Sequence, residues 1–145
     1  MDRRTFMQTL PAAGVVGADV TASAKDTKRV PHLPATAVYE LREYRCYEGR
    51  LNDLLARFRD HTMRIFERHG MTNVAYWTPT DDPLKSNTLV YVIAHASREA
   101  ADANWQSFRN DPEWKDVQAK SEANGKLVEK IESTFLLLTD FSPRL

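Results

Sequence analysis

The chain has 145 residues, with 20 Lys and Arg against 20 Asp and Glu, so its net charge is zero when the histidines are neutral. This length suits one domain with a real core and is too short for two. The charge balance argues against nucleic acid or an anionic membrane as the main partner, because both demand a basic surface. No run of about 18 apolar residues occurs, so we expect no integral membrane span.

The first 24 residues resemble a twin-arginine export signal. The pair Arg3-Arg4 precedes a mildly apolar stretch over 6–20, and Ala22-Ser23-Ala24 has an A-x-A cleavage pattern. We therefore predict a signal peptide over residues 1–24 and a periplasmic or secreted location. The alternative is a frayed N-terminal tail in which the arginine pair occurs by chance.

The stretch 25–36 contains two prolines and is typical of a short extended linker, so we place the folded domain at 37–143. The single cysteine, Cys46, cannot form an internal disulfide. The four histidines are scattered, and no tight cluster of His, Cys and Asp has the spacing of a metal site. We predict no metal and no cofactor.

The first expected strand covers 38–47 and ends at Gly49. A helix follows over 50–69, because Leu54, Phe58 and Ile65 belong to an apolar stripe at three- and four-residue spacing. Gly70 is a suitable residue for the position just after the helix.

The remaining elements follow from turn and capping signals. Ser97 suits the N-cap of a second helix, and Asp111-Pro112 restarts that helix with Asp as N-cap and Pro at the first helical position. The expected elements are strands over 72–78, 88–96 and 133–141, a turn over 79–87, and helical segments over 98–110 and 112–123.

The order βαββαβ predicts an α+β protein with a ferredoxin-like fold, in which one four-stranded antiparallel sheet carries both helical elements on the same face. In residues 73–77 and 88–94, apolar side chains occur at odd and even positions alike. An antiparallel strand with one face in water should instead alternate apolar and polar residues. The second face therefore needs cover. We expect a homodimer in which two copies close their sheets on each other. The alternative is a monomer whose 25–36 segment or C-terminal tail folds over that face.

Four sequence blocks cover the region after the linker in a distinctive order. The blocks are 38–44 (VYELREY), 66–70 (FERHG) with 76–79 (YWTP), 108–114 (FRNDPEW) and 139–143 (TDFSP). Together they resemble the NIPSNAP family. This resemblance implies the dimeric α+β barrel superfamily and gives no defined reaction, since NIPSNAP proteins lack a well-established one. More distant members of the superfamily include cofactor-free monooxygenases, lactone isomerases and haem proteins.

Two residues are candidates for catalysis. His61 is expected on the apolar side of the first helix, where an imidazole could act as a general base or a haem ligand. The alternative is a histidine at the edge of the core that is hydrogen-bonded to a strand or loop. Arg42 on the first strand could hold an anion.

Glu40 and Tyr44 share a strand face with Arg42, so two opposite charges and a phenol could line a cleft. A bulge would change which residues share this face. The alternative is an ion pair between Glu40 and Arg42 at the seam of the dimer.

Three further residues are candidates for ligand binding. Trp77 and Tyr91 would supply aromatic surface for a flat apolar ligand. His95 ends the third strand, and it could face the barrel or cap the following helix. Trp105 and Trp114 lie on helix faces aimed at the sheet, and we expect them in the core.

The leading functional hypothesis is a non-catalytic, exported homodimer that binds a small hydrophobic ligand or a partner protein in the barrel cleft. A second hypothesis is an oxygenase or isomerase without a tightly bound metal, with His61 as proton shuttle and Arg42 as anion holder. A third is haem binding through His61 or His95. The sequence leaves open whether the protein is an enzyme.

Overall fold

The computed structural model describes residues 32–143 and 145. The predicted signal peptide over 1–24, and the part of the predicted linker before residue 32, lie outside the described residues. Within the described part of the chain, no helix is both long and apolar enough to cross a membrane.

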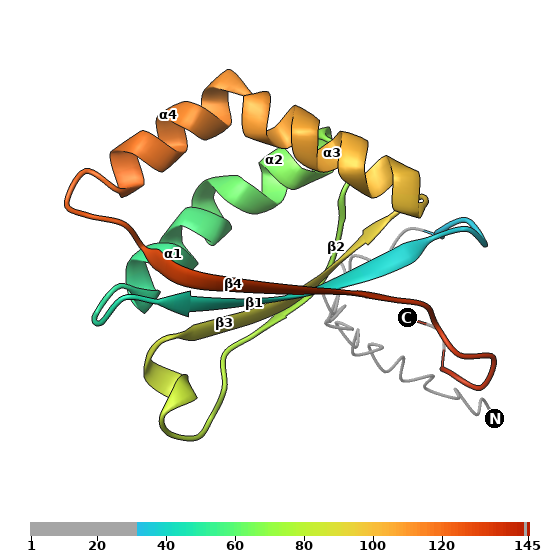
Figure 1. Cartoon of the computed structure of the whole chain (residues 1–145), viewed down its shortest axis with the longest axis horizontal. Coiled ribbons are helices and arrows are strands. Elements are labelled where there is room, and N and C mark those ends of the chain that lie inside the picture. The colour runs from blue at the N-terminus through green and yellow to red at the C-terminus, as the bar shows by residue number, and fades with distance from the viewer. Residues whose placement is uncertain (1–31, 144) are drawn as a thin grey trace, which may run out of the picture.

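The predicted α+β fold with the order βαββαβ is confirmed. Four antiparallel strands form one sheet in the order β2-β3-β1-β4, and the helices all cover the same face of it (Figure 1). The elements are β1 (Val38–Cys46), α1 (Leu51–Arg57), a π-helical turn η1 (Phe58–Thr62), α2 (Met63–Arg68), β2 (Thr72–Trp77), a 3-10 turn η2 (Leu84–Ser86), β3 (Thr88–His95), α3 (Arg98–Asn110), α4 (Pro112–Ser121) and β4 (Val128–Leu136).

The first helix contains the π-helical turn η1, which the sequence pattern did not predict. Here the N–H of Met63 bonds to the carbonyl of Phe58, so the turn holds one residue more than an α-helical turn. The extra residue rotates the chain about the helix axis. Thr62 takes the buried position and donates its hydroxyl to the carbonyl of Arg57, while His61 is exposed. The prediction that His61 lies on the apolar side of the helix is therefore wrong.

The last strand begins five residues earlier than predicted. β4 pairs with β1 from Val128, opposite Cys46, to Leu136, opposite Tyr39. The strand lies at the edge of the sheet, and most of its residues are exposed and polar, so its first half carries no apolar signal. The apolar run over 135–138 only begins in the strand, and Leu137 lies beyond its end, largely exposed.

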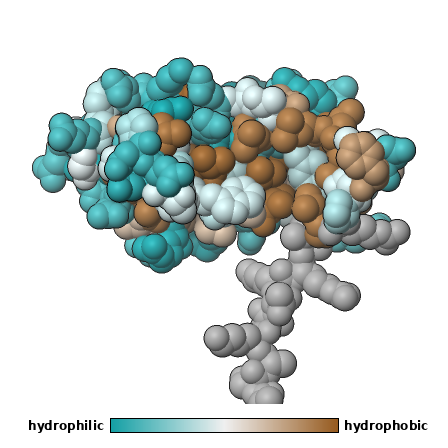
Figure 2. All heavy atoms as spheres, turned by 90° about the horizontal axis from the view of Figure 1, so that it is seen from below, coloured by the Kyte–Doolittle hydropathy of each residue, from teal (hydrophilic) through white to brown (hydrophobic). Residues whose placement is uncertain are grey.

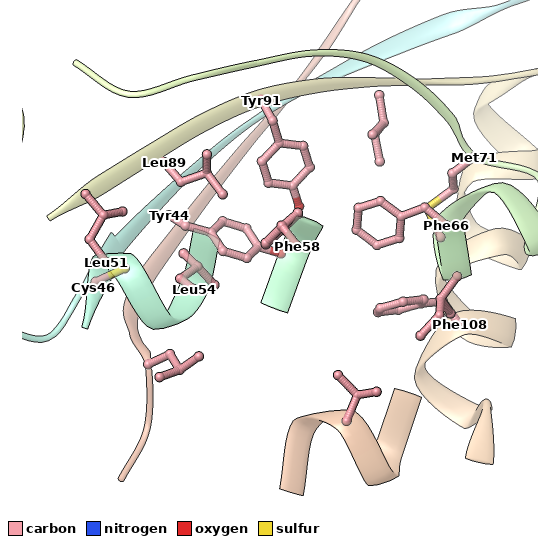
Figure 3. Close-up of a cluster of buried hydrophobic side chains, with 14 residues drawn as sticks. Tyr44, Cys46, Leu51, Leu54, Phe58, Phe66, Met71, Leu89, Tyr91 and Phe108 are labelled. Carbon is pink, nitrogen blue, oxygen red and sulfur yellow. The ribbon is translucent and has the colours of Figure 1, made fainter. Parts of the chain in front are cut away.

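Aromatic side chains fill much of the core between the sheet and the helices. The ring of Tyr91 on β3 lies 5.1 Å from that of Phe58 and 5.3 Å from that of Tyr44 (Figure 3). Phe66 lies 4.9 Å from Phe108, which joins α2 to α3. These edge-on and tilted contacts are the arrangement that aromatic pairs favour.

Asp111 locks the corner between α3 and α4. Its carboxylate caps α4 by accepting the N–H groups of Glu113 and Trp114, at 2.7 and 3.2 Å. It also accepts bonds from Arg68 at 2.6 Å and His69 at 2.5 Å, at the end of α2. These bonds hold the pKa of the Asp111 carboxyl well below its ordinary value, and the bond from Arg68 has the largest effect. One side chain thus fixes two helix ends, the end of α2 and the start of α4, and the predicted cap is confirmed.

We expect Asp111→Ala to lower the free energy of unfolding by about 1–2 kcal/mol, because the N-terminus of α4 loses its cap and the end of α2 loses its anchor. Urea unfolding at neutral pH measures this effect.

Asp116→Ala is the matched control, since it removes an exposed carboxylate of α4 whose ion pair, among the described residues, is with Lys120. The control should change the free energy of unfolding by less than about 0.5 kcal/mol. Equal losses in the two variants would contradict the role assigned to Asp111.

Candidate functional site

A buried carboxylate network joins the sheet to α3. Glu40 is 1% exposed, and its two oxygens accept bonds from side chains of four elements. The donors are Arg42 Nη1 at 2.5 Å, Trp105 Nε1 at 2.7 Å, Ser133 Oγ at 2.7 Å and His95 Nε2 at 2.9 Å. With four donors converging on it, the carboxylate is a fully hydrogen-bonded buried charge, as burial requires.

Glu40 is held in its ionised form. Burial raises the pKa of its carboxyl, but the hydrogen bonds from His95, Ser133, Trp105 and Arg42 together lower it by more, and the pKa stands at about 2. A carboxylate with this pKa cannot take up a proton near neutral pH. Its role in the site is therefore to hold neighbouring donors in place.

The hydrogen bonds also decide the tautomer of His95. The amide nitrogen of Asn104 donates to the carbonyl of Gly70, which fixes the orientation of the amide group. The same nitrogen lies 3.2 Å from His95 Nδ1, so it donates there, and His95 Nε2 carries the proton that is given to Glu40. Both ring nitrogens are thus engaged.

Arg42 lies between aromatic rings. Its guanidinium carbon lies 4.3 Å from the centre of the Trp105 ring and 5.4 Å from that of Tyr44, and Nη2 donates to the Tyr44 hydroxyl at 3.3 Å. Glu40 neutralises this charge from the other side. A stacked arginine with a fixed orientation suits recognition of a planar or anionic group.

A cleft of about 250 Å³ lies between the helices and the β4 edge of the sheet, and Tyr44, which accepts a bond from Arg42, connects it to this network. Its walls combine aromatic rings from the core with a few polar side chains from the first helix, from α4 and from the segment that follows α4. The residues that line it are Tyr44, Arg57, Phe58, Thr62, Phe66, Phe108, Trp114, Gln118, Glu122, Lys126, Val128 and Ile131.

The structure brings together five of the seven predicted site residues. They lie on the helix-facing side of β1 and β3, in adjoining register, and they are Glu40, Arg42, Tyr44, Tyr91 and His95. The ion pair between Glu40 and Arg42 is present, and both side chains point at the helices, away from the open face where a dimer seam is expected.

The remaining two predicted residues lie elsewhere. Trp77 pairs with Val90 on the open face of the sheet and is 52% exposed, and His61 faces solvent on the first helix. These two residues therefore do not join the other five, and Trp77 lies on the face that a second copy of the chain is expected to cover. A strand alternates its faces, and the bulge between Asn73 and Ala75 in β2 made the parity of Trp77 impossible to assign from the sequence.

Three residues of the site were not predicted. Trp105 was expected in the core, yet its indole N–H is bound to Glu40. Ser133 comes from the part of β4 that reads as polar. Arg57 follows Leu54 by three residues, so it lies at the edge of the apolar stripe of the first helix. A charged residue at that position was the one sequence signal that it belongs to the site.

Among the described residues, no three His, Cys, Asp or Glu side chains are grouped closely enough to hold a metal ion. The geometry thus defines an α+β protein of the ferredoxin-like type, with a ligand-sized cleft beneath its helices and one sheet face left open.

The family model of NIPSNAP matches residues 39–143, and the chain belongs to the NIPSNAP family. Comparison with proteins of curated function finds no match.

Solved structures share this fold. An uncharacterized NIPSNAP-like domain protein from Burkholderia xenovorans is 20% identical, with a TM-score of 0.65 over 77% of this chain and 93% of that one. A NIPSNAP family protein of unknown function from Agrobacterium tumefaciens is 24% identical, with a TM-score of 0.64 over 77% and 96%. SnoaB, a cofactor-independent oxygenase from Streptomyces nogalater, is 14% identical, with a TM-score of 0.50 over 75% and 99%.

We expect Glu40→Gln to lower the free energy of unfolding by about 3 kcal/mol at pH 7, because the change leaves the charge of Arg42 buried without its partner. Glu40 binds its proton less tightly in the folded chain, with a pKa of about 2 against an ordinary 4.5. Its contribution is therefore complete above pH 4.5 and is lost as the pH falls from 4.5 towards 2. Urea unfolding at pH 7, 5 and 3 measures it.

The gap between wild type and Glu40→Gln should narrow at pH 3. Glu99→Gln, an exposed position in the first turn of α3, is the control and should differ little from wild type at each pH. A gap that stays constant down to pH 3 would contradict an ionised Glu40.

Proposed function

We propose that this protein is an exported, homodimeric module that binds a small aromatic ligand in the cleft beneath its helices. The cleft itself is the observation that carries this proposal. Ligand pockets are concave and mostly apolar, with a few convergent polar groups, and their volumes begin at about 300 Å³. The cleft of about 250 Å³ has aromatic walls and lies just below this range, so it suits a ligand of one or two rings.

The shape of the cleft favours a small ligand over a partner protein. Phe58 and Tyr44 form part of its inner wall, where the core rings gather (Figure 3). A flat molecule inserted there would meet rings on more than one side, whereas a protein surface would reach only the rim. Ile131 on the edge strand stands at the cleft and is 49% exposed, so the opening lies along β4.

The open face of the sheet supports the homodimer. Figure 2 views this face and shows apolar side chains gathered over one part of it, with hydrophilic ones beside them. The register places Tyr39, Leu41, Val90 and Val92 on it, together with the exposed ring of Trp77. A two-fold axis would bury this patch against an identical one.

Binding accounts for the polar groups better than catalysis does. Glu40 stays ionised, and both ring nitrogens of His95 are hydrogen-bonded, so neither is free to move a proton. His61 is exposed and does not line the cleft, so it is not placed to act as a proton shuttle there. Haem ligation through His95 would require that residue to leave two partners. The oxygenase SnoaB shares the fold, and that likeness by itself assigns no reaction to this chain.

We expect Ile131→Trp to abolish ligand binding by filling the cleft from the edge strand, with little loss of stability because the side chain is half exposed. Saturation-transfer NMR with a set of one- and two-ring aromatic compounds measures binding.

Lys115→Trp adds the same indole on an exposed position of α4 and is the matched control. The control should bind as wild type does. If wild type binds none of the compounds, or if Ile131→Trp binds them equally well, the cleft is not the site.

For the assembly, we expect native mass spectrometry of protein from its natural compartment to show a dimer of chains that begin after Ala24. Val92→Glu should convert this dimer to monomer, because it places a charge in the apolar patch of the open face. Lys115→Glu is the control on the helical side. A wild-type monomer, or a chain that retains residues 1–24, would contradict the dimer or the export signal respectively.

A further inference from the structure

One charged side chain lies in the wall of the cleft and is almost fully buried. Arg57, at the end of α1, is 6% exposed. Its Nη1 donates to Ser121 Oγ and to Glu122 Oε1, both at 3.2 Å, and its guanidinium carbon lies 5.1 Å from the centre of the Trp114 ring. Its Nε finds no hydrogen-bond partner among the described residues. A buried arginine that is only partly engaged is costly unless something completes its bonds.

Most of the buried polar atoms left unpaired in the described chain are arginine N–H groups, which can only donate hydrogen bonds. Across residues 32–143 and 145, the buried side-chain nitrogen and oxygen atoms without a partner are the Nε atoms of four arginines and the hydroxyl of Tyr91. Three of these five groups lie in or near the cleft. Arg57 lines it, and Arg42 and Tyr91 both contact Tyr44, which also lines it. No carboxylate or amide oxygen is among those unpaired atoms. The unpaired arginine N–H groups therefore lack acceptors, and a ligand that complements Arg57 would supply one.

The hydroxyl of Tyr91 is a second unpaired polar group close to the cleft. Its side chain is fully buried behind Tyr44 and Phe58, two residues of the cleft wall (Figure 3). Burial raises the pKa of its phenol well above the ordinary value, so the hydroxyl keeps its proton. A protonated hydroxyl can donate to a ligand oxygen as well as accept a bond, so it is compatible with an acceptor-bearing ligand.

The charged residues that line the cleft also favour an anionic ligand. Arg57 and Lys126 are basic and Glu122 is the acidic residue that lines the same cleft, so the lining carries one positive charge in excess. Trp114 covers one side of the Arg57 guanidinium, and arginine in this setting binds carboxylate in a planar, two-point manner.

We propose that the ligand of this cleft is an aromatic acid, with its rings between the aromatic walls and its carboxylate on Arg57. This inference rests on the proposed function, because it names the chemical class of the molecule that the cleft binds. Glu122 competes with the ligand for Arg57, and it thereby sets the affinity.

The test compares three probes that share one ring system: 2-naphthoate, 2-naphthalenemethanol and 2-naphthylmethylammonium. Affinity for each is measured by isothermal titration calorimetry with wild type. We expect 2-naphthoate to bind at least about tenfold more tightly than the alcohol, as a hydrogen-bonded charge pair in a buried site allows, and we expect the ammonium probe to bind weakest.

Substitutions at two positions change this preference in opposite directions. Arg57→Gln should remove the preference for the acid over the alcohol, and Arg57→Lys should restore part of it. Glu122→Gln should bind 2-naphthoate about three- to tenfold more tightly, with the alcohol unchanged, because Arg57 loses its competing partner. A gain of affinity cannot arise from misfolding. Asp116→Asn removes the same charge from α4 away from the cleft and should leave all three affinities unchanged.

The outcomes separate the inference from the proposed function. If the alcohol or the ammonium probe binds as tightly as the acid, and Ile131→Trp still abolishes that binding, the aromatic acid is wrong and the binding cleft stands. The inference also fails if Arg57→Gln keeps the full preference for 2-naphthoate. If none of the three probes binds wild type, both the cleft and the acid are overturned.

Discussion

The hydrogen bonds of the Glu40 carboxylate are the constraint on which the site depends. The bond from Trp105 to Glu40 holds α3 on the sheet. The ion pair with Glu40 keeps the Arg42 guanidinium next to Tyr44, one of the residues that line the cleft. A carboxylate in this position is costly to bury, and it is stable only because four donors from four elements reach it. Ring packing of Phe66, Trp105 and Phe108 closes the layer around it. The same network that stabilises the fold therefore positions the polar side of the candidate site.

The cleft itself results from two irregular features of the helical layer. The π-helical turn places Thr62 and Phe58 in the cleft wall and turns His61 outward, and π-helical turns often occur at functional sites. The corner at Asp111 redirects the chain from α3 into α4, which then contributes Trp114 to the opposite wall (Figure 1). An unbroken pair of α-helices would place different side chains over the same sheet.

The two faces of the sheet have separate roles in this interpretation. The helix-facing side holds the charged network and the cleft, while the open side carries aliphatic and aromatic residues together with surface ion pairs such as Lys130–Glu132. Alternation along each strand makes this division possible, because neighbours such as Leu41 and Arg42 point in opposite directions. Ligand binding and assembly can therefore use the same strands without competing for the same residues.

The sequence by itself determined the element order, the α+β fold, the caps at Ser97 and Asp111, and the gathering of Glu40, Arg42 and Tyr44 on one side of a strand. Those features depend on local periodicity and on short-range hydrogen bonds, which neighbouring residues encode. Tertiary structure alone decided that this side faces the helices, that His61 points to solvent and Trp77 to the open face, and that Arg57 lines the cleft. A π-helical turn or a β-bulge shifts the register by one residue, and that single step, which leaves no mark in composition, changes the direction of every side chain after it.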